Sequence, residues 1–260
     1  MASPFSLEKK VAVVTGGSRG IGRAIALAMA RAGADVVIAA RKQSDLDATS
    51  HDIEAVGRQC LAVPTNVRER AALDNLVAQT VSKFGRLDIL VNNAVTNPHF
   101  GPVDSAEEWQ FDVILNTNLK AYFLLSNAAM KEMRKVGGGS IINLSSSGGY
   151  RYMNGLGLYC ISKAADIMLT KVQAVEWARY NIRANAIAPS IVRTSFAKEL
   201  WDTPAILNQA MSGTPMKRIA EPEEMGDIAV FLASNASSYV TGQVIVADGG
   251  GQAGPPPATW

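Results

Sequence analysis

Short runs of β-branched and aliphatic residues alternate with amphipathic stretches along most of the chain. The runs have the length and composition of buried strands, and the stretches between them have helical periodicity. The predicted strands are Val11–Thr15, Val36–Ala40, Leu61–Val63, Leu87–Val91, Ser140–Leu144, Ile182–Ile187 and Gln243–Ala247. The predicted helices are Gly20–Ala32, Ser44–Val56, Arg68–Phe84, Ser105–Arg134 and Leu158–Tyr180. Strands that are joined by helical crossovers pair in parallel, with helices packed on both faces of the sheet.

This alternation predicts one α/β domain over residues 1–260. We expect a doubly wound, Rossmann-type fold with a parallel sheet of about seven strands. Ser105-Ala-Glu-Glu108 has the order of a capping box, so Ser105 is predicted to open a long helix. The alternation lapses over residues 190–216, and the proline-rich tail, residues 251–260, cannot continue a helix.

Composition argues against several classes of function. The 25 basic and 23 acidic side chains give a net charge of +2, which offers no support for binding nucleic acid or a membrane surface. No apolar run reaches the roughly 18 residues of a membrane span, and the N-terminus lacks the apolar core of a signal peptide. Two cysteines, Cys60 and Cys160, and two histidines, His51 and His99, show neither a disulfide framework nor metal-ligand spacing. We expect a cytoplasmic protein without a metal.

A glycine-rich turn, Thr15-Gly-Gly-Ser-Arg-Gly-Ile-Gly22, joins the first predicted strand to the first predicted helix. Glycine permits unusual backbone angles and lets a diphosphate approach the helix N-terminus, whose free N–H groups bind anions. The spacing differs from G-x-G-x-x-G, so a turn without a ligand is an alternative. Its position after a strand favours dinucleotide binding. The binding residues would be Gly16, Ser18, Arg19, Gly20, Ile21 and Gly22.

The end of the second predicted strand bears on which nucleotide is bound. An acidic residue at this point would accept hydrogen bonds from a ribose 2′-hydroxyl, whereas arginine favours a 2′-phosphate. Arg41 stands there, and Arg19 lies inside the glycine turn. Two cations near one phosphate predict NADP(H) as the cofactor. The alternative is that both are solvated surface arginines.

Tyr159 and Lys163 stand at i and i+4 of a predicted helix and therefore share a face. A phenol has a pKa of about 10, and a nearby ammonium favours its ionised form. Such a tyrosine can exchange a proton with a substrate oxygen. Ser146, at the end of the fifth predicted strand, could polarise the same oxygen, although serine is also common in turns at strand ends.

These motifs, in this order, resemble the short-chain dehydrogenase/reductase family from Lys10 to Gly250. The matching segments are Thr15 to Gly22, Asn92-Asn93-Ala94, Asn118, Ser146, Tyr159-Cys-Ile-Ser-Lys163, Pro189 to Thr194 and Asp248-Gly-Gly250. The resemblance implies that Tyr159 is the general acid/base and that Ser146 donates a hydrogen bond to the substrate oxygen. It implies that Lys163 lowers the pKa of Tyr159 and holds the nicotinamide ribose. Asn118 would hold, through its backbone, a water that links Lys163 to solvent.

The same resemblance assigns further cofactor contacts. Asn66 and Val67 match the pair beside the adenine, and Asn93 matches a cofactor-contacting position. Val192 and Thr194 match the contacts to the nicotinamide carboxamide. The sequence departs from the family at Val95 and Ser190, where glycine is usual. Both positions line the nicotinamide and substrate region in the family, so a branched Val95 could narrow the pocket.

We therefore expect an NADP(H)-dependent oxidoreductase that acts on a carbonyl/alcohol pair. The substrate is expected to be a hydrophobic ketone, a 3-oxoacyl thioester or a steroid-like alcohol, bound by the loop region 190–216 and neighbouring loops. The candidate pocket residues are Phe100, Tyr150, Tyr152, Met153, Phe196, Leu200, Trp201 and Met211. The alternatives are a non-catalytic NADP(H)-binding sensor or scaffold, and a dehydratase or epimerase. The resemblance also implies a homotetramer, with the two long predicted helices at the subunit interface.

Overall fold

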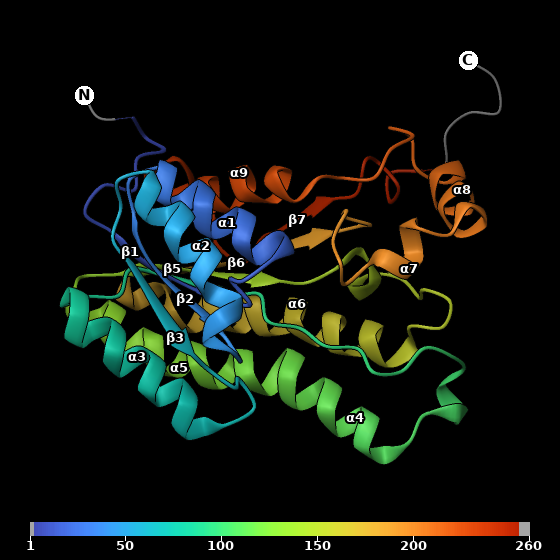
Figure 1. The fold of residues 1–260 in the computed structure, drawn as a ribbon, viewed down its shortest axis with the longest axis horizontal. Coiled ribbons are helices and arrows are strands. Elements are labelled where there is room, and N and C mark those ends of the chain that lie inside the picture. The colour runs from blue at the N-terminus through green and yellow to red at the C-terminus, as the bar shows by residue number, and fades with distance from the viewer. Residues whose placement is uncertain (1–2, 255–260) are drawn as a thin grey trace.

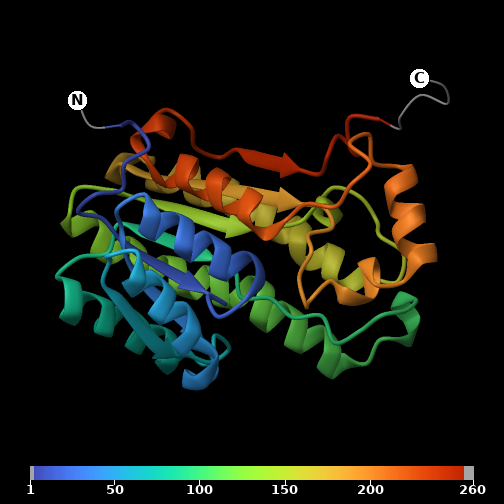
Figure 2. The same ribbon diagram turned by 45° about the horizontal axis from the view of Figure 1, so that its top comes forward.

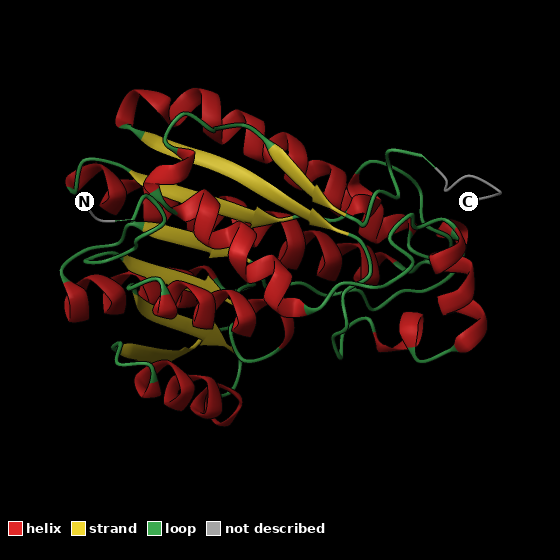
Figure 3. Ribbon diagram, turned by 90° about the horizontal axis from the view of Figure 1, so that it is seen from above, coloured by secondary structure: helices red, strands yellow, loops and turns green. Residues whose placement is uncertain are grey.

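The alternating segments form one layer of parallel strands in the computed structural model of the protein, which describes residues 3–254 apart from the side chain of Gln209. Within this range seven strands pair in the order β3-β2-β1-β4-β5-β6-β7 (Figure 3). The strands are β1 (Val11–Thr15), β2 (Asp35–Ala40), β3 (Cys60–Pro64), β4 (Ile89–Asn92), β5 (Gly139–Leu144), β6 (Ile182–Pro189) and β7 (Val244–Ala247). The predicted Rossmann-type fold is confirmed.

Helices cover both faces of the sheet, because the strands are apolar on both sides (Figures 1 and 2). One core lies under α1 (Gly20–Arg31), α2 (Gln43–Ala55) and α9 (Pro222–Ala233). The other lies under α3 (Arg70–Phe84), α5 (Ala121–Lys135) and α6 (Gly157–Trp177). The remaining α-helices are α4 (Glu108–Leu115), α7 (Lys198–Trp201) and α8 (Pro204–Ser212). Over residues 3–254, none of the helices combines the length and apolarity needed to cross a membrane.

The predicted capping box at Ser105 is wrong. Ser105 ends a short 3-10 helix, and its hydroxyl donates to the carbonyl of Pro102 at 2.7 Å. The box forms two residues later, between Glu107 and Gln110, so α4 begins at Glu108. A π-helical turn, Asn116–Lys120, then separates α4 from α5. The single long helix predicted here is three consecutive segments.

Two regions contain helices that the sequence pattern did not predict. Residues 190–216 contain α7 and α8, which lie beyond the carboxyl ends of the strands (Figure 1). Helix α9 was missed entirely, although Glu221 and Glu224 form a capping box and Pro222 occupies the first turn. This signal resembles the Ser105 pattern but uses an acidic cap in place of serine. Of the tail 251–260, residues 255–260 lie outside the described residues.

Candidate active site

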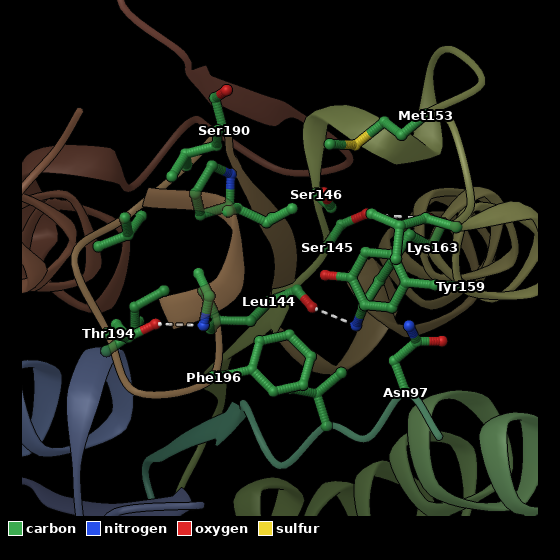
Figure 4. Close-up of a pocket in the computed structure, with 18 of the residues that line it drawn as sticks. Asn97, Leu144, Ser145, Ser146, Met153, Tyr159, Lys163, Ser190, Thr194 and Phe196 are labelled. Atoms are coloured by element: carbon green, nitrogen blue, oxygen red, sulfur yellow. Dashed lines mark hydrogen bonds between the residues drawn. The ribbon is translucent and has the colours of Figure 1, made fainter. Parts of the chain in front are cut away.

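A cavity opens where the carboxyl ends of β5 and β6 meet the start of α6 (Figure 4). Parallel α/β sheets bind ligands at this edge, outside the carboxyl ends of the strands. The lining includes Ile21 and Asn93 from the cofactor prediction, and Ser146, Tyr159 and Lys163 from the catalytic prediction. The fold therefore brings two groups of residues, predicted from distant parts of the sequence, to one cavity.

The glycine turn is held in place by Asn93, which follows β4. Its side-chain amide donates to the carbonyls of Thr15 at 2.8 Å and Gly16 at 3.3 Å. Gly16 and Gly20 have positive φ angles of 66° and 54°, a region that favours glycine. A Cβ on Gly22 would lie 2.2 Å from the carbonyl oxygen of Gly16. The turn is therefore closely packed against α1 and cannot admit larger residues there.

Gly22→Ala is expected to destabilise the fold by about 1–3 kcal/mol, the usual cost of overpacking a filled site. The clash falls on backbone, which cannot move as a flexible side chain can. Urea denaturation followed by circular dichroism measures the change. Gly213→Ala is the matched control, because its Cβ would lie 3.9 Å from the nearest atom. A Gly22→Ala protein as stable as the control would contradict the tight packing of this turn.

The turn and the α1 N-terminus fit a dinucleotide diphosphate. Arg19 occupies the N-cap of α1 without a side-chain hydrogen bond to the helix, so its side chain does not block the N-terminal N–H groups. A Cβ on Gly20 would meet the side chain of Thr194 at 3.1 Å, which places the predicted carboxamide-binding segment beside the turn. Val192 and Thr194 both line the cavity.

Of the two predicted nucleotide-selecting residues, Arg19 lies in the glycine turn and Arg41 directly follows β2, the neighbouring strand. The N–H groups of Gly16 and Gly17 donate to the carbonyl of Ala39, two residues before Arg41. Arg19 and Arg41 are both exposed. Of the predicted adenine-contacting pair after β3, Asn66 donates to Glu69 at 2.6 Å, and Val67 packs against the core under α3.

Tyr159, Lys163 and Ser146 form the predicted catalytic cluster. Tyr159 and Lys163 lie one turn apart on α6, and the Lys163 Nζ is 5.8 Å from the centre of the Tyr159 ring. Ser146 follows β5, and its hydroxyl accepts a hydrogen bond from the N–H of Gly148 at 3.0 Å. Its side chain lies close enough to Tyr159 to lower the pKa of that phenol. In Figure 4 the Tyr159 and Lys163 side chains lie together, with Ser145 and Ser146 above them. The three polar groups thus meet at one wall of the cavity.

The environment of Tyr159 differs from the expectation for an isolated Tyr–Lys pair. Burial raises the pKa of Tyr159, while the Lys163 ammonium and the Ser146 side chain lower it. Burial is the strongest of these influences, and the net pKa of Tyr159 is raised. The spacing in the sequence placed the Lys163 ammonium near Tyr159, but it did not show that the Tyr159 phenol is buried.

Asn118 is fully buried in the π-helical turn between α4 and α5. Its side-chain oxygen accepts from the N–H of Thr96 at 2.9 Å, and its amide donates to Ser162 at 3.0 Å. The Ser162 hydroxyl donates to the carbonyl of Tyr159 at 2.7 Å. Asn118 is therefore linked to the first turns of α6, and π-helical turns recur at functional sites.

Only half of the predicted pocket residues line the cavity. Phe100, Met153, Phe196 and Leu200 are lining residues, and the Phe196 ring centre lies 6.3 Å from that of Tyr159. The lining does not include the other candidates, which are Tyr150, Tyr152, Trp201 and Met211. Val95 and Ser190 do line it, as the resemblance to the family implied. Glu199 also lines it, within the predicted region 190–216. Sequence reasoning missed Leu144, the last residue of β5, and Leu156, the residue before α6, because residue type alone does not show which side chains face a cavity.

The chain is similar to known proteins over almost its whole length. Residues 16–252 match the family described as enoyl-(acyl carrier protein) reductase. Dehydrogenase/reductase SDR family member 4 of Bos taurus is 40% identical over 250 residues, covering 96% of this chain and 90% of that protein.

Two solved structures have the same fold and different ligands. One is gluconate 5-dehydrogenase from Burkholderia cenocepacia J2315 with NADP and tartrate, with a TM-score of 0.92, 32% identity, and coverage of 96% of this chain and 98% of that chain. The other is 7α-hydroxysteroid dehydrogenase with NADH and 7-oxo glycochenodeoxycholic acid, with the same TM-score, identity and coverages.

Proposed function

The chain belongs to the short-chain dehydrogenase/reductase family of oxidoreductases, and we propose that it interconverts a carbonyl and an alcohol with NADP(H). The observation that carries the proposal is the meeting of Tyr159, Ser146 and Lys163 at one wall of a cavity whose opposite side adjoins the glycine turn. Proton-exchanging groups and a dinucleotide-binding turn on one cavity are suited to hydride transfer coupled to proton transfer.

In the proposed reduction, Tyr159 donates a proton to the carbonyl oxygen of the substrate. The Ser146 hydroxyl donates a hydrogen bond to the same oxygen, which orients the substrate and polarises its carbonyl. Lys163 stabilises the phenolate that forms on Tyr159, as its lowering effect on the pKa of Tyr159 supports. Asn118, whose side chain bonds Ser162 of α6, would hold through its backbone a water that links Lys163 to solvent. When bound, NADPH supplies the hydride that reaches the carbonyl carbon.

The proposed cofactor site uses the glycine turn and the strand ends beside it. Gly16, Ser18, Gly20, Ile21 and Gly22 form the diphosphate cradle at the N-terminus of α1. Arg19 and Arg41 are proposed to contact a 2′-phosphate, and Asn66 and Val67 the adenine. Asn93 is a further proposed cofactor contact, and the proposed contacts at the nicotinamide half are Tyr159, Lys163, Val192 and Thr194. The two solved relatives differ here, since one contains NADP and the other NADH. The two exposed arginines favour NADP(H) for this chain.

The lining of the cavity supports a hydrophobic substrate. Phe196 lies beside Tyr159, and Phe100, Met153, Leu156 and Leu200 add further apolar surface. We propose a ketone, a 3-oxoacyl thioester or a steroid-like substrate, bound in part by residues 190–216. The steroid relative contains a bulky 7-oxo ligand, which is consistent with the last of these classes.

The proposed activity is tested by mixing the purified protein with NADPH and a panel of ketones. The panel spans aromatic ketones, 3-oxoacyl thioesters, oxosteroids and small hydrophilic sugars, and the loss of absorbance by the reduced nicotinamide is followed. We expect turnover with an apolar class and little with the sugars. NADPH binding without turnover on any carbonyl would favour the alternative, a sensor or scaffold. That alternative rests on Val95 and Ser190, which line the cavity where the family usually has glycine.

The exposed side of α4–α6 supports a homotetramer. Its large apolar side chains are unusually exposed for a monomer surface. They include Trp109, Phe111, Phe123, Ile161, Met168, Val172 and Val175.

The free cysteines Cys60 and Cys160 are consistent with the proposed cytoplasmic location.

Sedimentation equilibrium at micromolar concentration is expected to give about four times the 27.6 kDa of one chain. Val172→Asp places a charge on this apolar face and should shift the protein to smaller species. Val56→Asp is the control, because Val56 is exposed to a similar degree, 40% against 42%, at the end of α2. A wild-type mass near that of one chain, or an equal effect of both substitutions, would contradict the proposed interface.

A further inference from the structure

A buried ion pair lies directly behind the proposed catalytic tyrosine. The Lys163 ammonium is 2.8 Å from a carboxylate oxygen of Asp166 and donates to the carbonyl of Leu144, also at 2.8 Å. The two side chains are 1% and 0% exposed. Lys163 and Asp166 are three residues apart on α6, so both face inward from the same side of the helix. The proposed reaction uses Lys163 but leaves this carboxylate without a role.

Few other ionisable groups face the pair within the described part of the chain. The Tyr122 ring of α5 is 5.1 Å from the Lys163 Nζ, and the Tyr159 ring is 5.8 Å away. Cys160 adjoins Tyr159 on α6, and its thiol is buried. The second carboxylate oxygen of Asp166 is buried without a hydrogen-bond partner in the described residues. Lys163 is therefore the one cation that compensates Asp166 there.

This arrangement limits where the ammonium can lie. An ammonium has three N–H donors, and Leu144 and Asp166 accept two of them. The third is left for a group on the cavity side, where Lys163 contributes to the lining. Without the carboxylate, the Lys163 side chain would keep one of its two buried acceptors. Removing one partner of a buried ion pair leaves an uncompensated buried charge, which is strongly destabilising.

We propose that Asp166 is a positioning residue for the proposed oxidoreductase: it fixes the Lys163 ammonium behind Tyr159 and offsets part of its charge. The inference rests on the proposed function, because it assigns Asp166 a role through Lys163 and Tyr159. By offsetting the charge of Lys163, Asp166 also changes the pKa of Tyr159 in one definite direction. Lys163 stabilises the Tyr159 phenolate, whereas the negative charge of Asp166 opposes its formation, which raises the pKa of Tyr159.

Removing the Asp166 charge should therefore allow the phenolate of Tyr159 to form at lower pH. Burial lowers the pKa of Lys163, but Asp166 and the two tyrosines outweigh that effect, and the pKa of Lys163 is raised above its ordinary value. In Asp166→Asn the carbonyl of Leu144 and the ring of Tyr122 still face the ammonium. We expect Lys163 to stay protonated through the pH range of the measurement and to act on Tyr159 without its counter-charge.

The test is an ultraviolet titration of phenolate absorbance in wild type and Asp166→Asn. Each protein is paired with its Tyr159→Phe counterpart, and the difference isolates Tyr159 from the other tyrosines. We expect the Tyr159 transition to move to lower pH by about one unit, the lower end of the effect that a nearby charge typically has on a pKa. The alkaline limb of the reduction profile, measured as kcat/KM, should move in the same direction.

Thr170→Val is the matched control for a purely structural effect. Thr170 is also fully buried on α6, and its hydroxyl donates to the backbone carbonyl of Asp166 at 2.8 Å. This control should lower thermal stability without moving the Tyr159 transition. If Asp166→Asn does not fold, Asp166→Ala removes the same charge and leaves room for water.

The two readouts separate the inference from the proposed function. A Tyr159 transition that stays in place or moves to higher pH in a folded Asp166 variant would overturn the role of Asp166, whatever the activity. A downward shift with no turnover on any carbonyl would support the positioning of Lys163 and count against the proposed reaction instead.

Discussion

Replacing Tyr159 by phenylalanine is expected to lower kcat about 10²- to 10⁴-fold, the usual contribution of a general acid, while leaving the Kd for NADPH almost unchanged. The substitution removes only the phenol oxygen. The ring can still pack against Phe196, and the glycine turn that would hold the diphosphate belongs to another part of the cavity. A loss confined to kcat is the sign of an interaction that is made only in the transition state.

The measurement combines steady-state kinetics with the best substrate of the panel and fluorescence titration of NADPH. Tyr152→Phe is the control, because Tyr152 is 70% exposed and, among residues 3–254, its hydroxyl donates a hydrogen bond to Asn154 at the surface. It should retain wild-type turnover. If Tyr159→Phe keeps more than half of the wild-type rate, Tyr159 is not the proton donor. If its NADPH affinity falls in proportion to its rate, the substitution has disturbed the cofactor site.

Lys163→Ala is expected to behave differently from Tyr159→Phe. It removes the proposed ribose contact as well as the charge behind Tyr159, so both turnover and NADPH affinity should fall. It also leaves the fully buried Asp166 carboxylate without its cation. Breaking a buried pair in this way typically costs about 3–5 kcal/mol of stability, which a thermal denaturation curve would show. The comparison of the two variants separates proton transfer from binding.

Much of this site could be predicted from the sequence because its residues lie at strand ends and on one helix. Strand runs such as Val11–Thr15 identify the edge where the loops converge, and the helical spacing of Tyr159 and Lys163 gives their shared face. Asp166 lies on the same helix, but the sequence does not distinguish it from an exposed polar residue. It is fully buried only because of the tertiary packing. The raised pKa of Tyr159 has the same origin, because burial is a property of the fold rather than of spacing.

Helix boundaries were predicted less well than helix positions. Ser105 and Glu107 are both able to cap a helix, and the sequence pattern does not show which of them the chain uses. The structure uses Glu107, because the Ser105 hydroxyl is already bonded to Pro102. The missed α9 was capped by Glu221, an acidic residue that is less typical of caps than serine. Local hydrogen bonds made by competing side chains thus determine where a helix begins, which the periodicity of apolar residues does not show.

Arg41→Asp is expected to reverse the cofactor preference of the protein. Arg41 stands after β2, and the N–H groups of Gly16 and Gly17 tie the glycine turn to Ala39 of the same strand. A charge-assisted hydrogen bond contributes about 1.5–3 kcal/mol, less at an exposed site such as this one. Contacts from Arg41 and Arg19 should therefore favour NADPH over NADH by roughly tenfold or more. Aspartate removes one attraction, repels the 2′-phosphate and offers acceptors to the ribose hydroxyls of NADH.

Wild type and Arg41→Asp are titrated with both cofactors at fixed ionic strength, and the ratio of the two Kd values is compared. Arg31→Asp is the matched control: it makes the same change in net charge at an exposed position in the last turn of α1, at the other end from the glycine turn. It should leave the ratio unchanged. The preference should also weaken as salt is added, because both arginines are exposed and their attraction for the phosphate is screened. A wild type that binds NADH as tightly as NADPH, or an equal shift in both variants, would mean that Arg41 is a solvated surface residue and that the choice of cofactor lies elsewhere.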